Sequence, residues 1–232
     1  MSAVIGFLGS SIGRKYIMAT TGFLLFGFLI GHMSGNLLMF LGQDAINAYA
    51  VGLKSLLSGA GIWIARGGLL VLFIVHLGCA ISLTIENRRA RPVGYKYNAT
   101  VDASKASRTM IYTGLIILAF LIYHILHFTV GVTHPDHFNV KDYLGRHDVY
   151  TMVILSFSEL PVTASYIIAM VVLMLHLNHG LESMLQSLGI YSPENAPLAK
   201  KIAVTISVLL FLGQISVPVA IHFGLIQLAG GN

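Results

Sequence analysis

Charged residues are scarce in this chain. Only 10% of its 232 residues are charged, whereas 56% are hydrophobic, and the mean hydropathy is +0.79. In a typical soluble protein about a quarter of the residues are charged. We therefore exclude a soluble globular protein and expect an integral membrane protein. The net charge of +5 does not indicate a nucleic-acid partner, because basic residues between apolar segments commonly set membrane orientation.

Cysteine is nearly absent as well. Cys79 is the only one, which excludes an internal disulfide bond and a thiolate cluster for zinc or an iron–sulfur centre. The apolar segments also lack the Glu-x-x-His motif of di-iron helix bundles. Any redox centre in this chain is therefore expected to use nitrogen ligands. The N-terminal segment lacks the basic region of a secretion signal, so we expect no removable signal peptide.

Five apolar runs are long enough to cross a bilayer, which requires about 20 mostly apolar residues. The segments between them are too short for an independent soluble core. We predict an all-α membrane protein, a single domain over residues 1–232 that forms a bundle of five transmembrane helices. A partial amphipathic helix is expected in the connection 133–159. The predicted spans are 17–41, 62–85, 110–132, 160–185 and 202–228.

The basic residues are distributed unevenly between the two ends of these spans. Ten lie on the side of the N-terminus and four on the other, which places the N-terminus in the cytoplasm and the C-terminus outside. We expect a multi-pass protein of the inner (cytoplasmic) membrane. The ten are Arg14, Lys15, Arg88, Arg89, Arg91, Lys96, Lys105, Arg108, Lys200 and Lys201, and the four are Lys54, Arg66, Lys141 and Arg146.

Histidines are abundant inside the apolar runs. Ionisable groups are costly in lipid and usually face the interior of a bundle. A single one is often explained by an interhelical hydrogen bond, but seven of the ten histidines fall in the predicted spans. This density favours a ligand role. The seven are His32, His76, His124, His127, His176, His179 and His222.

Helix direction sorts these histidines by depth. His32 and His124 each lie about 15 residues from the cytoplasmic start of an outward-running helix. His76 and His176 lie at a similar distance from the outer start of an inward-running helix. The first and third spans therefore place one pair in the outer half of the membrane, and the second and fourth place another pair in the inner half. Two pairs of imidazole ligands at two levels predict two bis-histidine haems.

Two of the spans leave the ligand ambiguous. His124 with His127, and His176 with His179, are spaced by three residues and share a helix face. Either member of each pair can bind iron, and the other then serves as a hydrogen-bond donor near the haem. Further candidates for contacts to the haem are two asparagines and four basic residues, and membrane topology explains the basic residues equally well. They are Asn36, Asn178, Arg14, Lys15, Lys105 and Arg108.

Four motifs give the chain a specific resemblance. It resembles the single-polypeptide, di-haem cytochrome b that anchors enzymes of the succinate dehydrogenase and quinol:fumarate reductase family in the membrane. The motifs are Gly31-His32-Met33-Ser34-Gly35-Asn36, Ile74-Val75-His76, Thr113-Gly114 followed by Tyr123-His124, and His176-Leu177-Asn178-His179-Gly180-Leu181.

The resemblance implies that His124 and His176 are the ligands, so that His32 and His124 hold an outer haem b and His76 and His176 an inner one. It also implies a flavoprotein subunit with FAD and an iron–sulfur subunit on the cytoplasmic face, with menaquinone or another quinone as electron acceptor. This chain would belong to a succinate dehydrogenase without itself oxidising the dicarboxylate. Its quinone pocket stays unassigned, and a higher oligomer stays open.

One position departs from the family. Members with a proton pathway can carry glutamate two residues before the ligand of the fourth helix, where this chain has Met174. We therefore do not carry this pathway over to the chain. Glu159 and Asp44 lie near the outer boundary, where surface solvation explains them better than proton exchange at a quinone site.

Three other functions remain as alternatives. A quinol:fumarate reductase anchor uses the same machinery in reverse. A hydrogenase or formate dehydrogenase anchor shares the pattern of helices and histidines, although the quoted motifs argue against it. A proton-coupled transporter with a histidine relay is expected to show interrupted helices or repeated halves, and neither is evident in the sequence.

Overall fold

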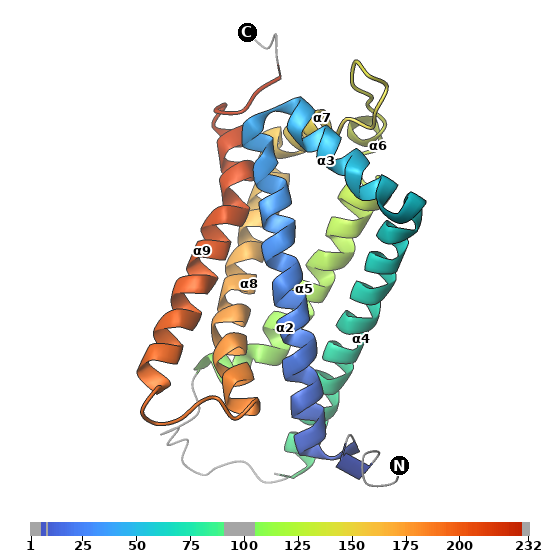
Figure 1. The fold of residues 1–232 in the computed structure, drawn as a ribbon. Helices are drawn as coiled ribbons and strands as arrows, with labels where there is room; N and C mark the ends of the chain where they lie inside the picture. The colour runs from blue at the N-terminus through green and yellow to red at the C-terminus, as the bar shows by residue number, and fades with distance from the viewer. Residues whose placement is uncertain (1–5, 8, 91–104, 229–232) are drawn as a thin grey trace. The chain divides into compact units, whose positions relative to one another are not determined.

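The computed structural model describes residues 6–7, 9–90 and 105–228, which are almost entirely helical (Figure 1). The five long apolar helices expected from the sequence are confirmed, and each is long and apolar enough to cross a membrane. Two of them continue into a tighter or wider helical turn, η1 and η3. The long helices are α2 Ser11–Asn36 with η1 Leu37–Leu41, α4 Ala60–Arg89, α5 Lys105–Ile125 with η3 Leu126–Val130, α8 Leu160–Ser187 and α9 Ala196–His222.

Several helices extend beyond the predicted spans, because capping groups rather than apolarity determine where a helix begins. Helix α2 begins at Ser11, where the Ser10 hydroxyl accepts a hydrogen bond from the backbone N–H of Gly13 at 3.0 Å. Helix α9 begins at Ala196 rather than residue 202, after Ser192 and Asn195 have exchanged side-chain to backbone hydrogen bonds. The number of long helices therefore agrees with the five predicted spans, and at these two ends the helix begins before the span.

Shorter helices occupy two of the connections. The helix expected in the third connection is present as α7 Val149–Ser158, preceded by the single turn α6 Pro135–Phe138. Helix α3 Gln43–Ser55, in the first connection, was not predicted. It packs against α7 and η1, as Figure 1 shows. Four α7 residues, Met152, Ile154, Ser156 and Phe157, are buried, so α7 packs into the protein.

The chain forms two compact units. The first contains Met1–Phe28, Gly67–Leu115 and Leu175–Ser207, and the second contains Leu29–Arg66, Ile116–Met174 and Val208–Asn232. Each long helix contributes one segment to each unit. The core of the second unit comes from η1, α3, α7, α8, α9 and the residues just after α9: Met39, Ile46, Ile154, Phe157, Val162, Tyr166, Val217, Ala220, Ile221 and Ile226.

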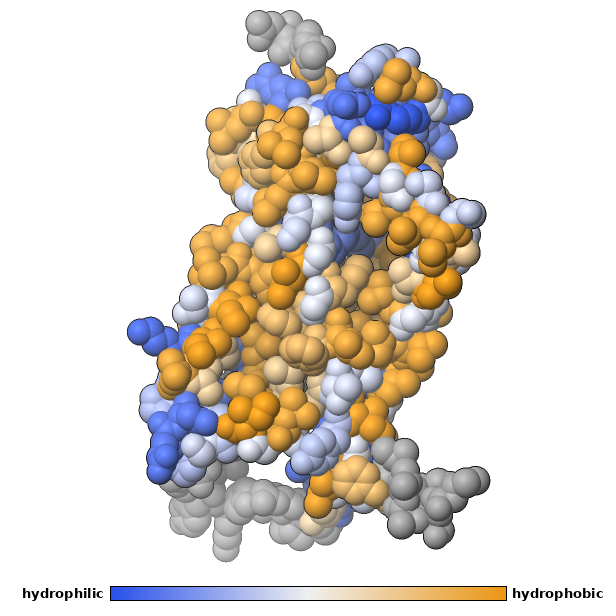
Figure 2. Space-filling view, viewed as in Figure 1, coloured by the Kyte–Doolittle hydropathy of each residue, from blue (hydrophilic) through white to orange (hydrophobic). Residues whose placement is uncertain are grey.

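The long helices leave much of their apolar surface uncovered. No more than 28% of the most apolar window of any of them is buried within the chain. Large side chains such as Phe23, Leu70 and Leu209 are exposed, and Figure 2 shows apolar side chains over most of the visible face. Water disfavours so much apolar surface, whereas lipid does not. These helices therefore suggest a multi-pass membrane protein.

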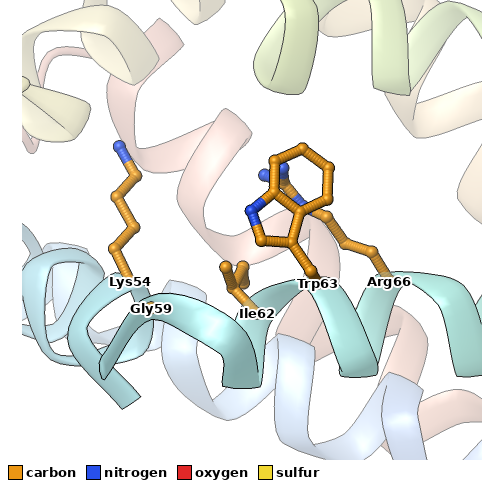
Figure 3. Close-up of a pocket in the computed structure, with 5 residues that line it drawn as sticks. All are labelled: Lys54, Gly59, Ile62, Trp63 and Arg66. Carbon is orange, nitrogen blue, oxygen red and sulfur yellow. The ribbon is translucent and has the colours of Figure 1, made fainter. Parts of the chain in front are cut away.

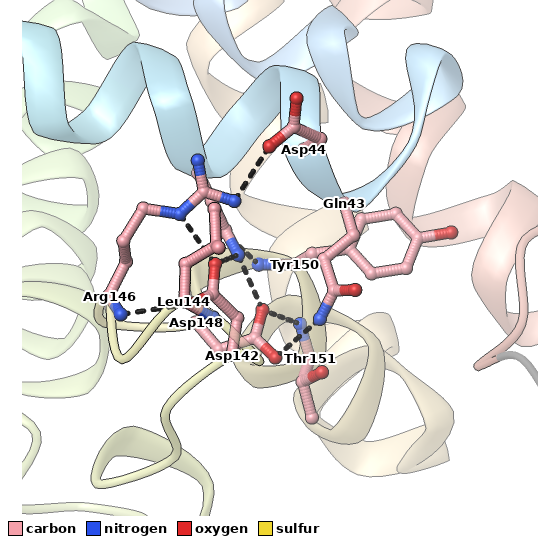
Figure 4. Close-up of polar contacts among 9 residues, drawn as sticks. Gln43, Asp44, Asp142, Leu144, Arg146, Asp148, Tyr150 and Thr151 are labelled. Atoms are coloured by element: carbon pink, nitrogen blue, oxygen red, sulfur yellow. Dashed lines mark hydrogen bonds and ion pairs between the residues drawn. The ribbon is translucent and has the colours of Figure 1, made fainter.

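A polar network in the second unit ties α3 to the start of α7 (Figure 4). Asn47 is fully buried, and its amide donates hydrogen bonds to Asp148 at 2.9 Å and to Asp142 at 3.1 Å. The Gln43 amide donates to the other Asp148 oxygen at 2.8 Å. Asp148 also caps α7 by accepting the backbone N–H of Thr151 at 3.1 Å. One buried carboxylate therefore holds two helices together.

Charge pairing supports the same network. Arg146 donates to Asp142 at 2.6 Å and to Asp44 at 2.7 Å (Figure 4). Burial opposes the charge of Asp148, but hydrogen bonds from Thr151, Asn47 and Gln43 outweigh it and hold the pKa of this carboxyl below its usual value.

Candidate functional site

The predicted ligands His76 and His176 both lie in the first compact unit. Nδ1 of His76 donates a hydrogen bond to the Met18 carbonyl oxygen at 3.1 Å. It also lies 3.2 Å from Oγ1 of Thr21, whose own hydroxyl donates to Ile17. Because a carbonyl oxygen can only accept, the hydrogen of this imidazole must be on Nδ1. Its Nε2 then carries the lone pair that a metal ligand needs.

His176 is held in the same way by helix α5. Its Nδ1 lies 3.0 Å from Oγ1 of Thr113, and the Thr113 hydroxyl donates to the carbonyl of Met110 at 2.9 Å. The threonine oxygen must therefore accept from Nδ1 of His176. No described residue hydrogen-bonds Nε2 of His76 or His176. Both imidazoles thus have the orientation typical of metal-bound histidine, with Nδ1 fixed and Nε2 available.

A Thr-Gly step accompanies each of these histidines. A Cβ added to Gly22 would lie 3.2 Å from Cε1 of His76, and one added to Gly114 would lie 3.6 Å from Cε1 of His176. Glycine therefore lets each imidazole approach the helix backbone next to the threonine that binds it. The step at 113–114 belongs to a motif quoted above, whereas its counterpart Thr21-Gly22 was missed. The repeated Thr-Gly dipeptide was the signal in the sequence.

The predicted ligands His32 and His124 both lie in the second unit. Their ring centroids are 5.8 Å apart, and their planes are nearly perpendicular at 86°. Metal–imidazole bonds are about 2 Å long, so two imidazoles on one metal place their ring centres about 6 Å apart. Nδ1 of His124 lies 3.3 Å from the Tyr166 hydroxyl. Asn36 lies 3.3 Å from Nε2 of His32, a contact that iron would replace.

His127 has a different environment from its neighbour His124. Its side chain is only 2% exposed. Nδ1 lies 3.1 Å from the Tyr166 hydroxyl, and Nε2 lies 3.1 Å from the Ser156 hydroxyl. Because both ring nitrogens are in hydrogen bonds, iron ligation by His127 would have to break one of them. Geometry therefore favours His124 as the ligand on this helix.

A cluster of histidines outside the spans was missed in the sequence. The rings of His134 and His137 stack with centroids 5.3 Å apart, and Nε2 of each lies 3.7 Å from the Glu159 carboxylate. The His134 ring is also 4.7 Å from that of buried His127. The sequence pattern singled out ligand candidates only among histidines inside the apolar runs, and His134 and His137 lie outside them. Together these residues form a chain of titratable groups from the exposed Glu159 to the protein interior.

The remaining polar candidates differ in their surroundings. On α2, Arg14 forms an ion pair with Glu86 at 2.7 Å, so a haem propionate would have to compete with that carboxylate. Lys15 is exposed at the start of the same helix. His179 and Asn178 are half-buried, and neither hydrogen-bonds to a described residue through its side chain. The side chains of Lys105 and Arg108 lie outside the described part of the chain.

Metal binding by a larger cluster finds no support. Among the described residues no group of three or more His, Cys, Asp or Glu is placed to hold a metal ion. A bis-histidine haem needs only two protein side chains, because the macrocycle supplies the other ligands. The absence of such a cluster among the described residues therefore does not bear on a bis-histidine haem.

Comparison with protein-family models, with curated proteins and with solved structures gave no match. The succinate dehydrogenase family thus stays a prediction from the sequence motifs.

Proposed function

We propose that this chain is the membrane-anchor cytochrome b subunit of a succinate:quinone oxidoreductase and holds two haem b groups. The observation that carries the proposal is the matched pair His76 and His176. Each has Nδ1 bound to the threonine of a Thr-Gly step and Nε2 available for iron. The 5.8 Å spacing of His32 and His124 supports a second bis-histidine site.

The protein's contribution to such sites is orientation and exclusion of water. Haem b supplies one-electron transfer when bound. The Met18 carbonyl and Thr21 fix the tautomer and ring plane of His76, and Thr113 fixes those of His176. These hydrogen bonds would raise the basicity of the nitrogen that would bind iron. The Tyr166 hydroxyl lies within hydrogen-bond distance of Nδ1 of His124 and limits the rotation of that ring. The apolar surroundings keep water from the sites, a factor that tunes redox potential.

The partners of this proposal come from the resemblance of the sequence motifs. That resemblance implies a flavoprotein with FAD and an iron–sulfur subunit, which would oxidise the dicarboxylate on the cytoplasmic face. The chain would then conduct electrons past His76 and His176 to His32 and His124, and on to menaquinone or another quinone. A cytoplasmic membrane location follows from this role. A quinol:fumarate reductase would use the same route in reverse.

One observation favours a second candidate. The chain of Glu159, His134, His137 and His127 resembles what a proton-coupled transporter requires. A cytochrome b uses such a chain differently, to exchange protons with a quinone. Haem content separates the two functions.

The test is the haem content of the purified full chain. We expect a b-type reduced-minus-oxidised spectrum with two haems per chain. Replacement of His76 or His176 by alanine should remove one haem, and replacement of His32 or His124 should remove the other. His222→Ala is the matched control, an intramembrane histidine with no predicted ligand role, and should keep both. A folded wild-type chain without haem would refute the proposal.

The soluble partners need a separate experiment. Membranes containing the intact complex should reduce a quinone analogue with succinate as donor, and the flavoprotein and iron–sulfur subunits should copurify. Reduction with hydrogen or formate, but not succinate, would assign the chain to a hydrogenase or formate dehydrogenase instead.

A further inference from the structure

The turn between α3 and α4 has an unusual backbone. It is formed by η2, Leu56–Gly59, in which Leu57 and Ser58 adopt left-handed conformations with φ of 50° and 55°. Residues other than glycine rarely adopt such φ values, because their Cβ atom clashes with the backbone. The turn brings Lys54, in the last turn of α3, next to the first two turns of α4. The result is a pocket at the end of a membrane-spanning helix.

Two cations and one indole line this pocket. Its volume is about 320 Å³, and its lining residues are Lys54, Gly59, Ile62, Trp63 and Arg66. Figure 3 shows Lys54, Trp63 and Arg66 projecting to the same side of the chain. The Arg66 guanidinium carbon lies 5.1 Å from the centre of the Trp63 ring. No carboxylate lines the pocket, and neither cation forms an ion pair with a described residue.

The direction of Arg66 follows from helix geometry. Side chains of an α-helix lean toward its N-terminus, so a residue in the second turn reaches back over the first. Arg66 therefore extends over Trp63 toward the beginning of α4, the end at which Lys54 lies. A long basic side chain near the end of a membrane helix typically extends in this way to bring its charge to the headgroup region. The lining residues thus concentrate positive charge where a membrane helix meets the interface.

Trp63 indicates the kind of surface that covers the pocket. Its side chain is 68% exposed, and its neighbour Ile64 is 66% exposed. Tryptophan is enriched where a membrane helix meets the headgroups, because its ring is apolar and its N–H is polar. An exposed indole beside two cations that no described carboxylate neutralises therefore fits the boundary between headgroup and acyl chain.

We propose that this pocket binds the phosphate group of an anionic phospholipid. Arg66 offers a planar fork of donors that matches phosphate oxygens, and Lys54 adds a second positive charge. Trp63 and Ile62 contact the glycerol and the upper part of the acyl chains. Basic pockets at the ends of membrane helices recognise anionic headgroups by this chemistry. The proposal does not depend on haem binding or on the soluble partners.

Trp63 provides the measurement, because it is the only tryptophan in the chain. The full chain is reconstituted in nanodiscs that contain brominated phosphatidylglycerol or, at equal mole fraction, brominated phosphatidylcholine. Bromine quenches a nearby indole. We expect phosphatidylglycerol to quench more strongly, with a preference of about fivefold for each cation that contacts the headgroup.

Substitutions connect the preference to the pocket. Lys54→Gln combined with Arg66→Gln should abolish it, and each single substitution should reduce it. Lys141→Gln is the matched control, since it removes one positive charge from a residue that does not line the pocket. It should leave the preference unchanged. Arg66→Lys keeps the charge and should retain part of the preference, which separates loss of charge from misfolding.

Three results would overturn the proposal. Equal quenching by the two lipids would show that the pocket does not select an anionic headgroup. A preference that survives the double substitution would place the selection elsewhere. A response of Trp63 to inorganic phosphate in nanodiscs of phosphatidylcholine alone, without a lipid preference, would assign the pocket to a free anion.

Discussion

Oγ1 of Thr113 lies 3.0 Å from Nδ1 of His176. The hydroxyl of Thr113 is already donated to a backbone carbonyl, so its oxygen acts as an acceptor and fixes the imidazole tautomer. Thr21 has the same relationship to His76 on another pair of helices. Two residues that carry no ligand atom therefore determine the orientation of two predicted ligands.

Thr113→Val tests this relationship. Valine has nearly the same shape but cannot accept a hydrogen bond, so His176 loses the group that fixes its tautomer. We expect the affinity for the haem held by His76 and His176 to fall by about tenfold or more. Haem stoichiometry and redox titration of the purified protein measure the effect.

Thr113→Ser keeps the hydroxyl and should restore the affinity. Thr129→Val is the control, because it makes the same change at an exposed residue whose side chain hydrogen-bonds to neither histidine. An unaltered haem content and an unaltered potential in Thr113→Val would contradict the role assigned to the hydroxyl.

Gly22→Ala tests the close approach of His76 to helix α2. The new Cβ would lie 3.2 Å from Cε1 of His76, so the imidazole has to move away from Thr21. We expect loss of the haem held by His76 and His176, which the reduced-minus-oxidised spectrum would show. Gly67→Ala is the matched control on α4, since its Cβ meets nothing within 4 Å. That variant should keep both haems and gain up to about 1 kcal/mol of helix stability.

His127→Leu separates the two histidines of α5 and η3. Leucine leaves the buried Ser156 hydroxyl without its histidine partner, whereas the Tyr166 hydroxyl loses one of two and keeps His124. An unsatisfied buried group costs about 1–3 kcal/mol. We expect a lower thermal unfolding midpoint with two haems still bound. His124→Leu should instead remove one haem. The opposite pattern, with haem lost only in His127→Leu, would reverse the assignment of the ligand.

The parts of the fold predictable from the sequence are those that composition controls. Apolar runs predicted the five long helices, because crossing a bilayer requires length and apolarity alone. Their ends depend on caps such as Ser10, which hydropathy does not measure. Helix α3 was missed although it has a local signal: Ile46, Tyr49, Ala50 and Leu53 recur at helical spacing, with Asp44 in the first turn and Lys54 in the last. The contact that holds it to α7 could not be predicted, because Asn47 and Asp148 lie about a hundred positions apart in the chain.

The residues of the candidate site likewise fall into those predicted from the sequence and those revealed only by the structure. His32, His76, His124 and His176 were predicted as ligands because ionisable residues are rare in apolar segments. Thr21 was missed, because its only signal was the second Thr-Gly dipeptide, whose role depends on a histidine of another helix. The cluster of His134, His137 and Glu159 lies in a polar connection, where histidines and carboxylates are ordinary. Only the folded chain brings it to His127.

Acid should weaken the attachment of α3 to α7 through Asp148. The pKa of this carboxyl is lower in the folded protein than its ordinary value of about 3.9. Its contribution to stability is therefore complete above the ordinary pKa and is lost as the pH falls through the lower, folded value. Hydrogen exchange of residues 43–55 measured across this acid range should show α3 opening as the carboxylate is protonated.

Asp148→Asn removes the charge while keeping an acceptor oxygen. One carboxylate oxygen is replaced by an amide nitrogen, so the side chain cannot accept from both Gln43 and Asn47, and we expect a loss of about 1–3 kcal/mol at neutral pH. Because asparagine does not titrate, protection of α3 in this variant should depend less on pH in the acid range. Asp136→Asn is the control, a carboxylate of α6 outside this network, and should behave as the wild type. An acid response of equal size in Asp148→Asn would assign the titration to another carboxylate, with Asp142 as the nearest.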